Sequence, residues 1–277
     1  MIRLFSILVG LFFTVALAWS LVVGGINLAS EGLPHSAERS FHKHPEPLHL
    51  ASDGMFGHFD KAQLQRGFKV YQEVCQACHS LRLVAFRDLK ALGYNDDEVK
   101  AIAKTYTIPA YNGATGEVVS KPGLPTDKFP PVPYGGQGNP PDLSLITKAR
   151  HGGAAYVHAL LMGYTDQATF KNEDGKLLLK EYPEAKTPDG LYFNPYFANL
   201  NIAMPEPITA DGQVTYSDGT KATKDQMSKD VSAFLVWTAE PKLEKRNQTG
   251  WPVLGFLLFA TVLAYMAYRN IWANQKH

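Results

Sequence analysis

Two long apolar runs flank a region of mixed polarity. The first begins after Arg3 and extends from Leu4 to about Gly24, and the second extends from Trp251 to about Tyr268. Runs of this length approach or reach the roughly 20 residues that cross a bilayer as a helix. The pattern therefore predicts a membrane segment near each end and one domain between them.

The N-terminal run has the layout of an export signal. Arg3 places a positive charge before the apolar stretch, and Ala16-Leu17-Ala18 offers a small-residue cleavage site. The stretch continues beyond this site to a length that spans a bilayer, so a cleaved signal peptide and a retained signal anchor both remain open. Either one sends the following domain out of the cytoplasm, and the second run then anchors that domain.

Two segments between the runs carry a clear helical pattern. Asp60 is a good N-cap, and the apolar positions after it recur at helical spacing and lead directly into a cysteine pair. Lys224 to Glu240 forms a second amphipathic pattern that ends before Pro241. The apolar face of the first helix is Leu64, Phe68, Tyr71, Cys75 and Cys78, and that of the second is Met227, Val231, Phe234 and Leu235.

Shorter helices and long loops fill the rest of this domain, so the expected fold class is mainly α. Asp142–Arg150 and Ala154–Tyr164 have helical patterns. Eight prolines and several glycines between Thr107 and Pro141 predict a long ordered loop without regular structure. Lys171–Gly190 is charged and turn-rich, which predicts an exposed excursion.

The expected division of the chain follows these patterns. Residues 1–24 are a signal peptide or N-terminal signal anchor, 25–55 a polar linker, 56–244 the central domain, 250–270 a transmembrane anchor helix and 271–277 a cytoplasmic tail. Four histidines in the linker could bind a metal, but they lack the regular or paired spacing of a metal site. These are His35, His42, His44 and His49.

The charge of the chain excludes one class of function. The formal net charge is +1 at pH 7, and no run of lysines and arginines interleaved with aromatic residues occurs. Proteins that bind nucleic acid carry a basic excess that this chain lacks. We therefore expect no nucleic acid partner.

The two cysteines of the chain stand three positions apart and are followed at once by a histidine. Cys75-Gln76-Ala77-Cys78-His79 is the attachment signature of a c-type haem. On a helix this spacing sets both thiols along one edge, where each can add to a haem vinyl group, and His79 then offers a neutral ring nitrogen to the iron. A redox dithiol and half of a zinc site are the alternatives. The first lacks a thioredoxin-like strand before the motif, and the second lacks further cysteines.

Further segments resemble a known family. The helix with Gly67, Tyr71 and Cys75 is similar to the N-terminal helix of class I cytochromes c, in which a glycine lets a C-terminal helix cross closely. An ordered set of later segments, together with the C-terminal anchor, is similar to the cytochrome c1 family from about Gly54 onward. These segments are Asn139–Ile146, Lys148–Gly153, Gly190–Phe197, Ala203–Pro205 and Asp230–Trp237.

The resemblance implies a class I cytochrome c-like haem domain with long loop insertions, one covalently bound haem c and a C-terminal transmembrane helix. It implies that Arg150 and Tyr156 lie at the haem propionates, where a guanidinium pairs well with a carboxylate. It also implies an electron-carrying subunit, without bond-making chemistry of its own, of ubiquinol–cytochrome c reductase (the bc1 complex). Its expected partners are cytochrome b, the Rieske iron–sulfur protein as electron donor, a soluble or membrane cytochrome c as acceptor, and the lipid bilayer. The haem domain is then expected in a bacterial periplasm, anchored in the inner membrane, with His277 in the cytoplasm.

Met204 is the expected distal iron ligand. Met162 falls in a predicted helix, whereas Met204 lies in a loop before Pro205 and ahead of the C-terminal helix, as class I cytochromes place this ligand. A thioether is soft and neutral, favours ferrous iron and so raises the potential. Met162, His151, His158 and an open position remain alternatives. The other methionines are set aside by position: Met1, Met55, Met227 and Met266.

The loop around Met204 departs from some bacterial relatives in the family, because no cysteine is left to form the disulfide that they carry. We therefore expect packing alone to hold this loop, since aromatic side chains bury large areas. The aromatic residues available are Tyr192, Phe193, Tyr196 and Phe197.

Two other functions compete with this interpretation. One is another membrane-anchored monohaem cytochrome, such as a terminal oxidase subunit, and the other is a haem-based gas sensor with an open iron position. Acidic residues could also attract a basic cytochrome c, although solvated acidic clusters are common. They are Asp96, Asp97, Glu98, Glu173 and Asp174.

Overall fold

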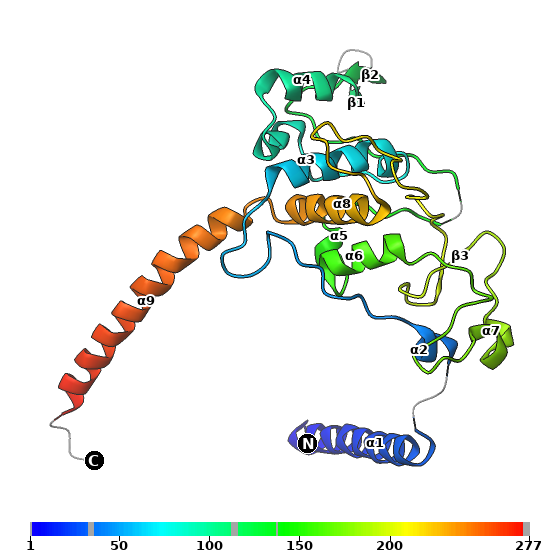
Figure 1. Cartoon of the computed structure of the whole chain (residues 1–277). Helices are drawn as coiled ribbons and strands as arrows, with labels where there is room; N and C mark the ends of the chain where they lie inside the picture. Colours follow the sequence, from blue (N-terminus) through cyan, green and yellow to red (C-terminus); the bar gives the residue numbers. More distant parts are fainter. Residues whose placement is uncertain (1, 33–35, 112–115, 137, 274–277) are drawn as a thin grey trace.

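A helical domain is flanked in the sequence by two long helices; α9 (Leu243–Trp272) extends away from the domain, and α1 (Ile2–Glu31) lies apart from it, below it in the view of Figure 1. The computed structural model describes residues 2–32, 36–111, 116–136 and 138–273, and the mainly α fold predicted from the sequence is confirmed. The α-helices are α1 Ile2–Glu31, α2 Ala37–Phe41, α3 Lys61–Val70, α4 Asp96–Lys104, α5 Ile146–Ala149, α6 Gly153–Met162, α7 Leu178–Glu181, α8 Lys224–Ala239 and α9 Leu243–Trp272. The other elements are the π turn η1 Tyr71–Cys75, the 3-10 helices η2 Phe86–Leu92 and η3 Pro183–Ala185, and the strands β1 Thr107–Tyr111, β2 Val118–Pro122, β3 Tyr192–Phe193 and β4 Asn201–Ile202.

The terminal helices α1 and α9 are both long and apolar enough to cross a membrane. Each has 30 residues, and the most apolar window of each is not buried against the rest of the chain. At about 1.5 Å per residue, such helices are longer than a bilayer core of about 30 Å. The predicted C-terminal apolar helix is confirmed. It begins at Leu243, before the apolar run, because the mostly polar residues 243–250 belong to the same helix.

Helices α3 and α8 lie side by side and pack against each other at the centre of the domain (Figure 1). Asp60 caps α3, as the sequence predicts, by accepting hydrogen bonds from the backbone N–H groups of Ala62 and Gln63 at 3.0 and 3.2 Å. The two helices approach most closely at Gly67, where an added Cβ atom would lie 2.1 Å from the carbonyl oxygen of Asp230. Any side chain here would force the helices apart, so this close approach requires glycine.

Aromatic side chains fill the space around this helix contact. Phe68 of α3 and Phe234 of α8 have ring centroids 5.5 Å apart. Phe129, from the loop after β2, lies 6.2 Å from Phe68, and Trp237 stacks on Phe234 at 5.7 Å. Burial of each such side chain contributes about 1.5–3 kcal/mol, so the aromatic cluster is a main apolar support of the domain.

A buried charge cluster also bridges α3 and α8. The carboxylate of Asp230 is fully buried and accepts a hydrogen bond from Nε of Arg66 at 2.9 Å. It also accepts hydrogen bonds from the side-chain amides of Gln63 and Gln226 at 3.1 and 2.8 Å. A buried charge is tolerated when an opposite charge and further hydrogen bonds compensate for lost hydration, and both are present here. The cluster therefore favours one register between the two helices.

The segment from Thr107 to Pro141 differs in part from the sequence expectation. The sequence predicts no regular structure here, but β1 and β2 form an antiparallel ribbon in which Thr107 pairs with Pro122. The expectation is wrong for this part because both strands of a two-stranded ribbon are edges, where Pro109 and Pro122 need no outward N–H group. From Gly123 to Pro141 the described residues form no helix or extended strand, as expected.

A second apolar cluster includes residues of two segments, one predicted as a polar linker and the other as an exposed excursion. The segment 25–55 contains the end of α1 and the helix α2, which buries Phe41 against Tyr182 and Phe170 at ring-centroid distances of 6.0 and 6.3 Å. Leu178, inside the expected exposed excursion, is fully buried in the same cluster. These partners are far apart in the sequence, so a local pattern cannot reveal them. The described residues of both segments therefore contribute buried side chains that the sequence does not predict.

Candidate functional site

The cysteine motif lies where the first core helix ends. α3 passes into η1, a π turn in which the N–H of Gln76 donates to the carbonyl of Tyr71 at 2.8 Å. The N–H of His79 then donates to the carbonyl of Cys75 at 2.9 Å. The sequence predicts a regular helix through the motif, and the structure has a wider turn instead. Such π turns are frequent at functional sites.

His79 has one ring nitrogen occupied by a hydrogen bond. Its Nδ1 lies 2.7 Å from the carbonyl oxygen of Pro141. A carbonyl only accepts, so we assign the proton to Nδ1, which leaves the lone pair on Nε2. Burial lowers the pKa of His79, although the hydrogen bond to Pro141 opposes this shift. The ring is thus a neutral imidazole with a free Nε2, which is the form that ligates a metal.

The environment of Cys75 argues against a redox dithiol. Burial raises the pKa of Cys75 to about 12. Reactive Cys-x-x-Cys pairs instead have a cysteine whose pKa is lowered by nearby positive charge or a helix N-terminus. The zinc alternative also lacks support, because the described part of the chain holds no group of three or more metal-binding side chains.

Residues from distant parts of the sequence pack against the main apolar core of the domain. Cys75, Tyr156 and Met204 are each partly buried and pack against the same core cluster. Tyr71 belongs to that cluster, and its hydroxyl donates to the carbonyl of His79 at 3.0 Å. Residues of the cysteine motif, of α6 and of the loop before α8 therefore contribute to the same core, which extends through the domain.

The loop around Met204 is held by hydrogen bonds that sequence reasoning missed. The hydroxyl of Tyr164 donates to the carbonyl of Met204 at 2.9 Å. Asn194 is fully buried; its side chain donates to the carbonyl of Leu160 at 2.8 Å and accepts from the N–H of Tyr196 at 3.1 Å. The expectation that packing alone holds this loop is therefore wrong. A polar amide between aromatic residues was the available signal, because a buried amide must find partners.

The predicted aromatic residues of this loop have different surroundings. Phe193 is buried, but in the second apolar cluster with Phe41 and Phe170. Tyr192 is 44% exposed, so it adds little packing. Tyr196 lies against Gly163 at the end of α6, where an added Cβ would be 2.5 Å from its ring. Only part of the predicted aromatic set therefore packs near α6.

Arg150 and Tyr156 lie beside one another at the start of α6. Burial raises the pKa of Tyr156, and the charge and hydrogen bond of the Arg150 side chain oppose this shift. Arg150 is exposed, and its Nη1 donates to the carbonyl of its neighbour Ala149 at 3.3 Å. In the described residues no carboxylate pairs with this guanidinium. Free guanidinium donors next to a tyrosine hydroxyl suit a carboxylate of a ligand.

The alternative ligands differ in their surroundings. Met162 is at the end of α6 and is 39% exposed. His158 lies on the same helix, and its Nε2 is 2.9 Å from the carboxylate of Asp225 on α8. His151 is exposed in the turn before α6. Met204 is partly buried and packs against the core cluster that also contacts Cys75, whereas Met162 and His151 are exposed.

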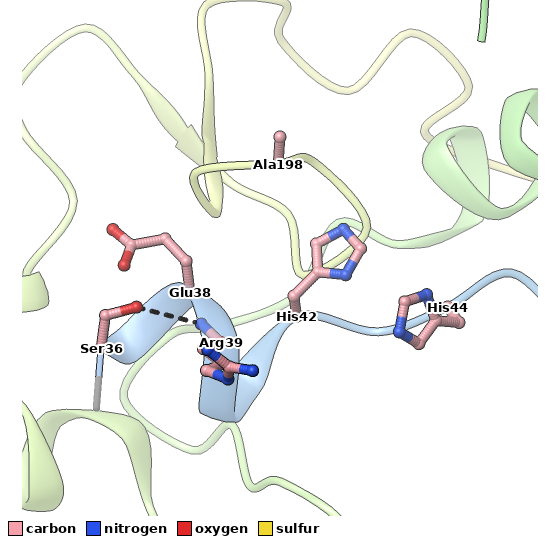
Figure 2. Close-up of a pocket in the computed structure, with 6 residues that line it drawn as sticks. All are labelled: Ser36, Glu38, Arg39, His42, His44 and Ala198. Atoms are coloured by element: carbon pink, nitrogen blue, oxygen red, sulfur yellow. Dashed lines mark hydrogen bonds between the residues drawn. The ribbon is translucent and has the colours of Figure 1, made fainter. Parts of the chain in front are cut away.

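The histidines of the 25–55 segment do not form a metal site in the described residues. Figure 2 shows His42 and His44 beside a cavity of about 540 Å³, together with Ser36, Glu38, Arg39 and Ala198. The rings of His42 and His44 have centroids 5.3 Å apart. His49 is exposed and does not line this cavity, and His35 lies outside the described residues.

The acidic residues at the start of α4 have a structural role. Asn95 caps the helix and accepts from the N–H groups of Asp97 and Glu98 at 3.0 and 2.9 Å. Asp96 pairs with Lys90, and Asp97 with Lys100. Acidic side chains in a first turn also favour the helix dipole. These features give the acidic residues of α4 a structural role.

The mainly helical domain, the Cys-x-x-Cys-His motif at the end of its first core helix and the close helix contact at Gly67 define a class I c-type cytochrome. Residues 50–275 match the sequence profile of the Cytochrome C1 family. The chain belongs to the cytochrome c1 family.

The similarity to relatives covers nearly the whole chain. A protein named cytochrome c1 from Rhodospirillum rubrum is 39% identical over 274 residues, which cover 93% of this chain and 97% of the relative. A Bradyrhizobium diazoefficiens protein named cytochrome b/c1 is 41% identical over 237 residues, or 80% of this chain and 34% of that longer protein. The mitochondrial heme protein cytochrome c1-2 of Solanum tuberosum is 40% identical over 232 residues, 80% of this chain and 83% of the relative.

Membership of this family implies a covalently bound c-type haem. The residues described above fit such a group on chemical grounds. Two thiols stand at the attachment spacing, His79 is a neutral imidazole with a free Nε2, and Arg150 has guanidinium donors that no described carboxylate engages. The apolar cluster beside Cys75 offers the low-dielectric surroundings that hold a haem.

Proposed function

We propose that this chain is the electron-transferring c-type cytochrome subunit of a ubiquinol–cytochrome c reductase, the bc1 complex. Family membership supports this role, and the name cytochrome b/c1 of the Bradyrhizobium relative supports an association with cytochrome b. The electron donor would be a Rieske iron–sulfur protein, and the acceptor a soluble or membrane cytochrome c. The chain itself would make and break no substrate bond.

One haem would be attached, because the sequence contains one Cys-x-x-Cys-His motif. Cys75 and Cys78 would hold it as thioethers, His79 would be the proximal iron ligand and Met204 the distal one. The observation that carries the assignment of His79 is the 2.7 Å contact between its Nδ1 and the carbonyl of Pro141, which leaves Nε2 free.

A haem bound here would supply an iron centre that accepts and releases one electron. The side chains of the protein would set its potential and position. Met204 offers a neutral thioether, which favours the ferrous state and raises the potential. Arg150 and Tyr156 would bind the propionates, and the partly buried core residues around Cys75 would exclude water.

The membrane arrangement follows from the terminal helices. α9 would anchor the haem domain, residues 56–244, on the periplasmic side of a bacterial inner membrane, with residues 271–277 in the cytoplasm. α1 would be either a cleaved signal peptide or a second anchor. His277 lies outside the described residues. The N-terminal residue of the purified protein distinguishes the two fates of α1.

Covalent attachment and assembly test this proposal directly. We expect the haem to remain with the protein in acidified organic solvent, and the intact chain to gain the mass of a single haem. Cys75→Ala together with Cys78→Ala should abolish this mass gain. Extraction of all haem from the unaltered chain would contradict the attachment. Co-purification with a cytochrome b and an iron–sulfur protein would support membership of the complex, and purification of the membrane-extracted chain alone would argue against it.

A further inference from the structure

The carboxylate of Asp142 joins two chain segments beside the haem-attachment motif. Its Oδ2 accepts hydrogen bonds from the hydroxyl of Ser80 and from the backbone N–H of Arg82, both at 2.8 Å. Its Oδ1 accepts from the N–H of Ser144 at 3.0 Å. The guanidinium of Arg82 adds an ion pair at 3.4 Å. One side chain therefore ties the residues that follow His79 to the segment around Pro141.

Two more hydrogen bonds hold the same segments together. The N–H of Leu143 donates to the carbonyl of Ser80 at 2.9 Å, and the N–H of Leu83 donates to the hydroxyl of Ser144 at 3.1 Å. Ser144 is fully buried, so its hydroxyl has a defined partner. These hydrogen bonds form a network between the two segments. Among the described residues, Asp142 is the only charged acceptor in this network.

This network fixes the segment that carries the carbonyl of Pro141, which accepts a hydrogen bond from the ring of His79. Pro141 immediately precedes Asp142, and the carbonyl between the two residues accepts from Nδ1 of His79 at 2.7 Å. The position of that carbonyl depends on how the following residue is held, because the peptide group is planar. Hydrogen bonds to an ionised carboxylate are shorter and stronger than those between neutral groups, so Asp142 contributes much of the restraint.

We propose that Asp142 is a positioning residue that keeps the Pro141 carbonyl on Nδ1 of His79 and thereby sets the orientation and donor strength of the imidazole. The inference rests on the proposed ligation of haem iron by His79. A ligating histidine whose second nitrogen donates to a fixed acceptor is a stronger base toward its metal. A stronger proximal donor, and a negative charge nearby, both favour the ferric state. Asp142 therefore lowers the midpoint potential, in opposition to the thioether of Met204.

Asp127 is a matched control for a merely structural role. It too lies in a loop, accepts a backbone N–H, from Leu124 at 2.9 Å, and pairs with a lysine, Lys121, at 2.9 Å. Its side chain is 20% exposed, against 17% for Asp142. Its hydrogen bonds involve the ribbon β1–β2 and not the haem-attachment motif. Loss of Asp127 should therefore disturb a loop without altering the proximal ligand.

The experiment uses the full-length chain in its membrane, with the variants Asp142→Ala, Asp142→Glu and Asp127→Ala. Optical redox titration gives the midpoint potential, and electron paramagnetic resonance of the ferric haem gives the g-values that report the axial ligand field. We expect Asp142→Ala to raise the potential and shift the g-values. Asp142→Glu keeps the charge but displaces the carboxylate, so it should also shift the g-values, with a smaller rise in potential. Asp127→Ala should leave both readouts unchanged.

Two results would overturn the inference. One is an Asp142→Ala protein whose g-values equal those of the unaltered protein. The other is an Asp142→Glu protein that matches the unaltered one in both readouts, which would reduce Asp142 to a nearby charge. If Asp142→Ala yields no haem-containing protein, Asp142→Glu decides by the same criterion. Failure of the proposed function is seen separately, as an unaltered chain without covalent haem.

Discussion

The two candidate iron ligands are held in different ways. On one side, the ring of His79 itself is bonded, through Nδ1 to the carbonyl of Pro141 at 2.7 Å, and Asp142 holds the segment that carries this carbonyl. On the other side, the thioether of Met204 has no polar restraint of its own in the described structure. The main chain of Met204 is held instead, by the hydroxyl of Tyr164 at 2.9 Å.

This difference predicts two kinds of control over the iron centre. A bond to the ligand ring changes how strongly the ring donates to iron, so residues near His79 are expected to tune the electronic properties of the centre. A bond to the main chain only sets where the ligand lies, so residues near Met204 are expected to decide how well the thioether competes with other ligands. The first kind of change is seen in the potential, and the second in ligand exchange.

The largest effect is expected at Gly67, where α3 and α8 approach each other most closely in the core of the domain. Gly67→Ala would place a methyl group 2.1 Å from the carbonyl oxygen of Asp230 and 2.7 Å from Cβ of Phe234. Overpacking usually costs about 1–3 kcal/mol, and contact with main chain should reach or exceed the upper end. We expect little haem-containing protein in membranes, measured by haem staining against the amount of chain. Gly250→Ala, which has nothing within 4 Å, is the control and should accumulate normally.

Removal of the distal thioether should have the next largest effect. Met204→Leu keeps the apolar volume but not the sulfur, so the midpoint potential should fall by well over ~0.1 V, and reduced iron should bind CO. Redox titration and the CO difference spectrum measure these changes. Met162→Leu is the control and should keep the native potential. The assignment fails if the two variants exchange these outcomes.

The fold was largely predictable because its main signals are local. Asp60 as N-cap and a helix over Lys224–Glu240 are predicted from residue patterns, and the structure has both, with α8 ending at Ala239. The apolar face predicted from Leu64 to Cys78 is only partly helical, because α3 ends at Val70 and continues as a π turn. The close helix contact at Gly67 came from the family resemblance, and it is confirmed by the approach to Asp230. The ribbon β1–β2 was missed because its pattern is short and contains prolines.

The support of the candidate site was much less predictable. Pro141 and Asp142 lie more than sixty residues after His79, and no local periodicity connects them. The sequence predicts Tyr164 as the last residue of a helix and makes no prediction for the side chain of Asn194. Hydrogen bonds between distant segments leave no sequence period, so they appear only when the fold brings the segments together.

A smaller, distal effect is expected from the buried amide of Asn194. Asn194→Ala leaves the N–H of Tyr196 without its partner and leaves the carbonyl of Leu160 with only the 3.4 Å hydrogen bond from the N–H of Gly163. The loss of a partner for a polar group costs about 1–3 kcal/mol where the group is buried. We expect a lower thermal midpoint, and a ferric haem that loses its methionine ligand before the domain unfolds. Absorption spectra recorded during heating measure both. Asn199→Ala is the control: its exposed side chain accepts only from the N–H of Asn201 at 3.2 Å among the described residues, so both changes should be much smaller.

The smallest effect should follow from the loss of one hydroxyl. Tyr164→Phe removes the hydrogen bond to the carbonyl of Met204 and leaves the ring in place. A hydrogen bond of this kind contributes about 1 kcal/mol, which corresponds to roughly a fivefold change in an equilibrium constant. We therefore expect imidazole to displace Met204 from ferric iron about fivefold more readily, with little change in midpoint potential. Optical titration with imidazole measures the affinity, and Tyr192→Phe, in an exposed tyrosine of the neighbouring strand, is the control. Equal affinities in both variants would mean that main-chain anchoring does not govern ligand exchange, whereas a shifted potential with unchanged affinity would place Tyr164 in the same kind of control as Asp142.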